Sequence, residues 1–201
     1  MRPMLTLGLA LVLAGPAHAD SVTDQLDQAK QYYGQGDIAG AIGELEFAMQ
    51  ELRGRLGAAY LATFPQPPAG WTLVPAEPEA TSGAMPFLGG GNMLKREYRN
   101  EAGGASIDAQ LMIGGSFLQG LASMFMSPQV LAAQPGAKRV RIGRENAVAT
   151  YDPAERTGQL MLDVGGKVSI MLDGKGLSGT EPLVDLASHW DIQKVKQLAG
   201  L

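Results

Sequence analysis

The sequence predicts an α+β protein, with an antiparallel sheet of about five to seven strands flanked by helices and preceded by an N-terminal helical hairpin. Apolar residues recur at helical spacing before residue 62 and alternate along short segments after residue 70. Turn residues separate these short segments, as is typical of antiparallel strands. The proline-rich stretch 64–70 lies between the two patterns and blocks helix continuation. We therefore expect a signal peptide at 1–19, a helical hairpin at 20–62 and an α+β domain at 63–201.

Residues 1–19 have the features of a cleavable secretory signal peptide. Arg2 precedes an apolar stretch from Leu5 to Gly15, Pro16 ends that stretch, and Ala17-His18-Ala19 is a small-x-small cleavage site. The apolar stretch is shorter than the roughly 18 residues of a transmembrane helix. We expect cleavage after Ala19 and a periplasmic protein with no integral membrane segment. The chain has no cysteine, which excludes both a lipidated cysteine and stabilising disulfides.

The charge balance narrows the classes of partner. Removing Arg2 from the 16 basic side chains leaves 15 against 20 acidic ones, a formal charge of −5. A negative chain is a poor match for nucleic acid or for an anionic membrane surface. We therefore expect a protein partner in the cell envelope or a small apolar ligand.

The region 20–62 predicts two helices. Asp20 or Ser21 can cap the first, Gly34-Gln35-Gly36-Asp37 forms the turn, and Asp37 can cap a second helix from about Ile38 to Tyr60. The second helix carries an apolar stripe of Ile38, Ala41, Ile42, Leu45, Ala48, Met49, Leu52 and Leu56. The pattern Ala29-x2-Tyr32-Tyr33-x2-Gly36-Asp37-x3-Ala41-Ile42-x2-Leu45-x2-Ala48 resembles one tetratricopeptide-type helix pair. Because repeat arrays need several copies, we expect either a lone hairpin packed on the main domain or a partner-binding module.

The region 63–201 predicts a sheet with helices around it. The segment 81–92 is rich in glycine and is expected to be a flexible loop. Helices are predicted at about 117–126, 129–133, 181–189 and 192–199, with Asp191 capping the last. Asp173-Gly174-Lys175-Gly176 is predicted to be a turn, and Gly165-Gly166 a two-residue hairpin loop. The predicted strands are Trp71–Val74, Met93–Arg99, Ala105–Ile113, Lys138–Ile142, Asn146–Asp152, Gly158–Val164 and Lys167–Leu172.

Two resemblances follow from the start of this region. The pattern Phe64-Pro65-x4-Gly70-Trp71, followed by strand–helix–strand order, resembles the opening of the PsbP/Mog1-like fold. That resemblance implies a curved antiparallel sheet flanked by helices. The chain also resembles a family of small proteobacterial periplasmic proteins that share a Pro-x-Gly-Trp motif and a Met-rich helix. The second resemblance implies no activity.

Residues suited to catalysis are few, so we expect a protein that is not an enzyme. Ser116 precedes a predicted helix, but a nucleophile elbow needs glycine at position 118, which is Leu118, and a helix cap explains the serine. His189 is the one histidine after the signal peptide, and it lies at a predicted helix end. One histidine and no cysteine are too few for a zinc site. The triplet Gly89-Gly90-Gly91 lacks the lysine of a phosphate-binding loop. We expect no cofactor and no metal.

Methionines are the unusual feature of the sequence. Strand parity places Met112, Met161 and Met171 on the face opposite the alternating aliphatic residues. Either another layer covers that face, or it lines a groove for an apolar ligand or Cu(I). The predicted partner or ligand surface combines these three residues with those of the Gly/Met loop 83–93 and of the Met-rich segment 124–128. Its members are Met85, Phe87, Met93, Met112, Met124, Phe125, Met126, Met161 and Met171.

We therefore expect an exported, non-enzymatic accessory or binding protein that acts through an apolar Gly/Met-rich surface. The alternative is a carrier that holds a small apolar ligand between sheet and helices. A Cu(I)-binding protein and a hydrolase that uses carboxylates alone, such as Asp108 with Asp163, are further alternatives.

Overall fold

A computed structural model describes residues 20–75, 85–87, 91–114 and 136–201, with the backbone alone for 85–87, 91 and 92. The predicted signal peptide, part of the predicted loop 81–92 and the predicted helices at 117–126 and 129–133 lie outside these residues. The chain divides into two compact units, Met1–Gly54 and Arg55–Leu201. The division falls inside a helix.

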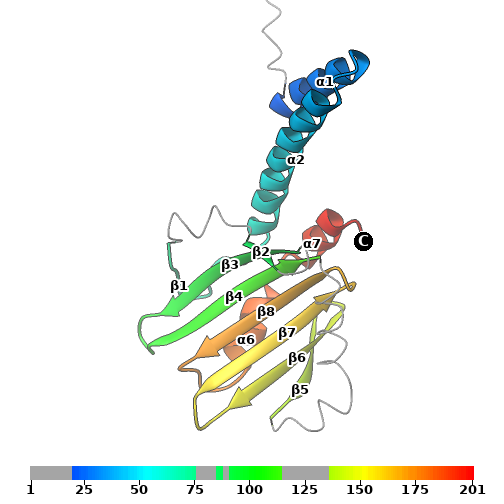
Figure 1. The fold of residues 1–201 in the computed structure, drawn as a ribbon. Coiled ribbons are helices and arrows are strands. Elements are labelled where there is room, and N and C mark those ends of the chain that lie inside the picture. The colour runs from blue at the N-terminus through cyan, green and yellow to red at the C-terminus, as the bar shows by residue number, and fades with distance from the viewer. Residues whose placement is uncertain (1–19, 76–84, 88–90, 115–135) are drawn as a thin grey trace, which may run out of the picture. The chain divides into compact units, whose positions relative to one another are not determined.

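The first unit contains the predicted helical hairpin. Helix α1 (Ser21–Gly34) begins after Asp20, whose side chain accepts a hydrogen bond from the backbone N–H of Val22. Helix α2 (Ile38–Leu61) begins after Asp37, whose Oδ1 accepts from the N–H of Gly40 at 2.9 Å. Between them Gly36 has a φ of 81°, a left-handed conformation that glycine adopts without steric cost. Both capping predictions are confirmed, and Figure 1 shows the two helices as a hairpin.

The second unit is built on one antiparallel sheet. The described strands run in the order β1-β3-β4-β8-β7-β6-β5, and β2 also pairs with β3. Every pairing is antiparallel, so the predicted α+β class is confirmed. The strands are β1 (Thr72–Leu73), β2 (Met85–Phe87), β3 (Gly91–Asn100), β4 (Ala105–Ile113), β5 (Lys138–Ile142), β6 (Glu145–Asp152), β7 (Thr157–Val164) and β8 (Val168–Lys175).

One face of the sheet carries the core. Alternating aliphatic residues of β4, β6, β7 and β8 are buried there, under α6 (Glu181–Ser188) and α7 (Ile192–Ala199). Both helices lie behind the sheet in Figure 1. The side chain of Asp191 accepts from the N–H of Lys194, which confirms the predicted cap of α7. Among the described residues, no helix is long and apolar enough to span a membrane.

The stretch after α2 is part of the core. Thr63 and Phe64 are buried, the Phe64 and Trp190 rings lie 4.4 Å apart, and Trp190 Nε1 donates to Thr63 Oγ1 at 3.1 Å. Buried Tyr98 donates its hydroxyl hydrogen to the carbonyl of Pro65 at 2.8 Å. The segment that separates the two sequence patterns is therefore fixed to the sheet and to the turn between α6 and α7.

Three local predictions differ from the structure. Part of the predicted loop 81–92 is strand, because β2 pairs with the first residues of β3. The hairpin between β7 and β8 has Val164 opposite Val168 and thus three loop residues, although both Gly165 and Gly166 do have positive φ.

The predicted turn at 173–176 is also wrong over most of its length, because β8 continues to Lys175. A Cβ atom on Gly174 would lie 2.3 Å from Leu177 Cδ1, and one on Gly158, its partner in β7, would lie 3.1 Å from Leu183 Cδ1. These glycines stay in the strands because two leucines fill the space where their side chains would be.

We predict that Thr63→Val destabilises the protein by about 1–3 kcal/mol, because the buried indole N–H of Trp190 loses its acceptor. Urea unfolding followed by tryptophan fluorescence measures the change. Thr63→Ser is the matched control, since it keeps the hydroxyl and removes one methyl group. Equal midpoints for wild type and Thr63→Val would contradict this role.

We predict a specific loss of stability in alkali. Burial raises the pKa of Tyr98 to about 12, and the positive charge of Arg96 opposes this increase. A pKa higher in the folded than in the unfolded chain means that the stabilisation is complete below about pH 10 and is lost as the pH rises toward 12. Urea midpoints measured from pH 9 to pH 12 should fall less steeply for Tyr98→Phe than for wild type. Tyr33→Phe is the control, because the Tyr33 side chain is exposed.

Candidate functional site

The predicted Met-rich surface is only partly within the described residues. Met124, Phe125 and Met126 lie outside them, and for Met85 and Phe87 the backbone alone is described, in β2. The remaining four predicted residues lie on the face of the sheet opposite the core. They are Met93, Met112, Met161 and Met171.

The strand register confirms the predicted parity of Met112, Met161 and Met171, and it pairs the four methionines across strands. Met161 lies opposite Met171, and Met93 lies opposite Met112. Met112 and Met161 are 8% and 6% exposed, whereas Met93 and Met171 are half-buried. Because two of the four are buried, this face offers a partner less apolar surface than the sequence suggested. The Met-rich surface therefore stays a prediction.

A polar cluster lies next to the methionines on the same face. Asp173 Oδ1 accepts from Gln159 Nε2 at 2.7 Å, and its Oδ2 accepts from Gln110 Nε2 at 3.3 Å. Asp173 and Gln159 also line a hollow of about 350 Å³ at the ends of β6, β7 and β8. The two amides hold the carboxylate in place. Among the described residues, no three His, Asp or Glu side chains are arranged to hold a metal ion.

The structure does not bring together the two carboxylates named for a hydrolase. Asp108 of β4 lies opposite Asp173 of β8, whereas Asp163 of β7 lies opposite Ser169. Their positions therefore differ by four residues along β8, which is about 13 Å of extended strand. Asp163 Oδ2 instead accepts from the N–H of Gly166 and supports the β7–β8 turn.

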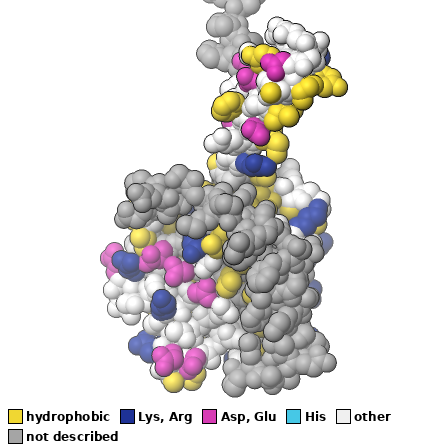
Figure 2. Space-filling model, in the orientation of Figure 1, with side chains coloured by type: hydrophobic (Ala, Val, Ile, Leu, Met, Phe, Trp, Pro, Cys, Tyr) yellow, Lys and Arg dark blue, Asp and Glu magenta, His cyan; other side chains and the backbone are white. Residues whose placement is uncertain are grey.

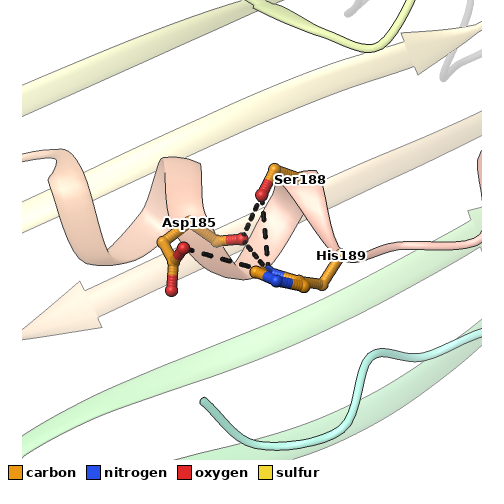
Figure 3. A network of polar contacts seen from close by, with 3 residues as sticks. All are labelled: Asp185, Ser188 and His189. Atoms are coloured by element: carbon orange, nitrogen blue, oxygen red, sulfur yellow. Dashed lines mark hydrogen bonds and ion pairs between the residues drawn. The ribbon is translucent and has the colours of Figure 1, made fainter. Parts of the chain in front are cut away.

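His189 ends α6 in a small polar network (Figure 3). Its Nδ1 lies 2.8 Å from the backbone carbonyl oxygen of Asp185 and 3.4 Å from Ser188 Oγ, and Ser188 Oγ donates to the same carbonyl at 2.7 Å. A catalytic triad needs the serine and the carboxylate at opposite ring nitrogens. Here the serine and the Asp185 carboxylate, at 3.9 Å, both lie on the Nδ1 side of an exposed ring. The network therefore caps a helix end, as the sequence predicted.

Helix α2 carries a line of exposed apolar side chains. Five large side chains that are between 44% and 52% exposed follow one another along it at intervals of four, three, four and three residues. In the first unit, Figure 2 shows hydrophobic and acidic side chains close together on the surface of the hairpin. We call these five residues the α2 seam: Ile38, Ile42, Leu45, Met49 and Leu52.

The predicted apolar stripe of α2 is in fact two surfaces. Ala41 and Ala48 are 5% and 1% exposed, and Val22 and Ala29 of α1 are 6% and 4% exposed. Ser21 Oγ donates to Glu51 Oε1 at 2.6 Å, which places the start of α1 beside the later turns of α2. The hairpin therefore buries its small residues between the helices and leaves its large residues outside.

The spacing of the α2 seam is that of a coiled-coil interface. Alternating steps of three and four residues keep side chains on one line when a helix packs lengthwise against another helix. With Ile42 and Met49 at the a positions, Leu45 and Leu52 take the d positions. On α1, Leu26 and Tyr33 are also exposed. This arrangement can bind a helix and has no group suited to catalysis along the seam itself.

Sequence reasoning found the stripe but did not separate its two surfaces. A signal for the separation is present, because the small residues Ala41 and Ala48 are seven apart and the five seam residues keep heptad spacing. A second signal is the distribution of charge. Residues 20–54 contain seven acidic and two basic side chains, whereas residues 55–201 contain thirteen of each.

Comparisons with protein-family models, curated proteins and solved structures found no match to this chain.

We predict that two substitutions one turn apart in α2 differ in their effect on stability. Leu45→Gln should change the free energy of unfolding by no more than about 0.5 kcal/mol, as expected for an exposed position. Ala48→Gln should destabilise by about 1–3 kcal/mol, because the longer side chain overfills the buried helix interface. Thermal unfolding followed by circular dichroism at 222 nm gives both values. A large loss for Leu45→Gln would mean that the seam is part of a core.

Proposed function

We propose that this protein is an exported, non-enzymatic accessory protein that binds another protein in the cell envelope, and that the α2 seam is its binding surface. The observation that supports the proposal is the exposure of five large apolar side chains at heptad spacing. Soluble proteins rarely expose a contiguous apolar patch of this kind unless it contacts a partner. A helix of a partner is the occupant that this spacing fits.

The ligand-carrier alternative has weaker support. An apolar hollow of about 240 Å³ lies at one end of the sheet in the second unit, lined by Tyr60, Ile113, Val168, Leu198 and other residues. Its volume is below the about 300–1,000 Å³ that is typical of small-molecule sites. The other described hollow, of about 350 Å³, is lined mainly by polar side chains. Neither hollow combines the size and the apolar lining that a carrier needs.

We predict that a photo-crosslinker in the α2 seam captures a discrete partner in living cells. Replacing Leu45 with p-benzoylphenylalanine places the reactive ketone in the seam, and replacing Gln50, which is also exposed but outside the seam, gives a matched control. Irradiation should yield a crosslinked species from position 45 and much less of it from position 50. Ile42→Gln/Met49→Gln should abolish that species, whereas Gln28→Ala/Gln50→Ala should leave it unchanged.

Mass spectrometry of the crosslinked species decides between occupants of the seam. A second protein joined at position 45 supports the proposal. A link within the chain itself would show that the α2 seam packs on another part of the same molecule. A link between two copies would make the seam a homodimer interface, and either of these results would overturn the proposal.

A further inference from the structure

We propose that the α2 seam binds a basic amphipathic helix, in which lysine and arginine flank an apolar heptad line. This inference rests on the proposed function and specifies the chemistry of the partner. Its basis is the charge of the unit that carries the seam, an observation separate from the exposure of the apolar residues.

The net negative charge of the chain from residue 20 onward is concentrated in the first unit. Residues 20–54 have a net formal charge of −5, because two basic side chains oppose seven acidic ones. Residues 55–201 have a net formal charge of zero. The seven acidic residues are Asp20, Asp24, Asp27, Asp37, Glu44, Glu46 and Glu51. A partner that docks on this unit therefore meets an excess of negative charge.

The heptad positions place part of this charge beside the seam. Glu46, between Leu45 and Met49, and Arg53 are at e positions, where coiled coils form ion pairs with the partner helix, so one acidic and one basic side chain flank the seam there. Asp24 and Asp27 are exposed on α1. Lysine or arginine on a docked helix would complement these carboxylates, and such complementary charges raise association rates and select among partners.

A second copy of this chain is a poorer occupant. Two hairpins in contact would bring a formal charge of −5 against another −5, and like charges across an interface oppose association. The five seam residues, each about half exposed, offer roughly 500 Å² of apolar surface, slightly below the about 600 Å² per partner of the smallest specific interfaces. An interface of that size does not offset strong charge repulsion, whereas opposite charges would add to its affinity.

The test uses the chain from Asp20 to Leu201 and two synthetic helical peptides. Both peptides have leucine at every a and d position, and they differ at e and g, which are lysine in one and glutamate in the other. Fluorescence anisotropy measures Kd at about 0.1 M and about 1 M salt, between which the Debye length falls from about 10 Å to about 3 Å. We expect the lysine peptide to bind with a Kd of about 10 µM at the lower salt, a value suited to a small interface.

Three comparisons decide the outcome. The glutamate peptide should bind at least about tenfold more weakly than the lysine peptide, and high salt should remove most of that difference. Asp27→Asn/Glu46→Gln should weaken binding of the lysine peptide about threefold and reduce its salt dependence, since it removes two of the seven carboxylates of the first unit. Ile42→Gln/Met49→Gln should abolish binding, and Gln28→Ala/Gln50→Ala should leave it unchanged.

Failure of this inference can be separated from failure of the proposed function. Equal binding of the two peptides, or no peptide binding while position 45 still crosslinks to a second protein in cells, would overturn the basic partner and leave the binding function standing. If neither peptide binds and no crosslink depends on the seam, both proposals fail. A seam-dependent dimer in sedimentation at about 10 µM protein would identify a second copy as the occupant and overturn the basic partner.

Discussion

The fold of the second unit depends on the pairing of β4 with β8, which joins strands about 60 residues apart in the chain. This pairing connects the β3–β4 hairpin to the β5–β8 meander and sets Leu111 opposite Ile170 on the core face. The same register sets Gln110 opposite Met171 on the other face. Because side chains alternate along a strand, a slip of one residue would exchange the two faces. The positions of the core, the methionines and the polar cluster around Asp173 all follow from this one register.

Packing at one end of the sheet and within the core fixes the positions of the helices in the second unit. At one end, paired Gly158 and Gly174 leave room for Leu177 and Leu183, so the chain after β8 can turn directly into α6. Elsewhere in the core, Trp190 contacts Phe64 and donates to Thr63, which ties the residues after α2 to the turn before α7. The C-terminal part of α2 is thereby part of a folded core.

The N-terminal part of α2 differs in which of its side chains are buried. Its small residues are buried in the hairpin, and its large ones face outward at heptad spacing. Exposed apolar side chains favour aggregation unless they are matched by a partner or by surrounding charge. Placing the net charge of the chain from residue 20 onward in this hairpin supplies repulsion between copies and, in our proposal, attraction for a basic helix.

The sequence by itself determined the features that depend on local periodicity and on turn chemistry. The helices after Asp20, Asp37 and Asp191 begin at capping residues, and β4 and β5 have the predicted bounds, because caps and strand alternation act within a few residues. Only the tertiary structure decided which strands pair, why Gly174 lies in a strand, and which part of the α2 stripe is buried. These depend on contacts between distant residues, such as Leu177 over Gly174, and an apolar stripe alone does not reveal which of its residues are covered. For that reason the seam residues were visible in the sequence, but their exposure was not.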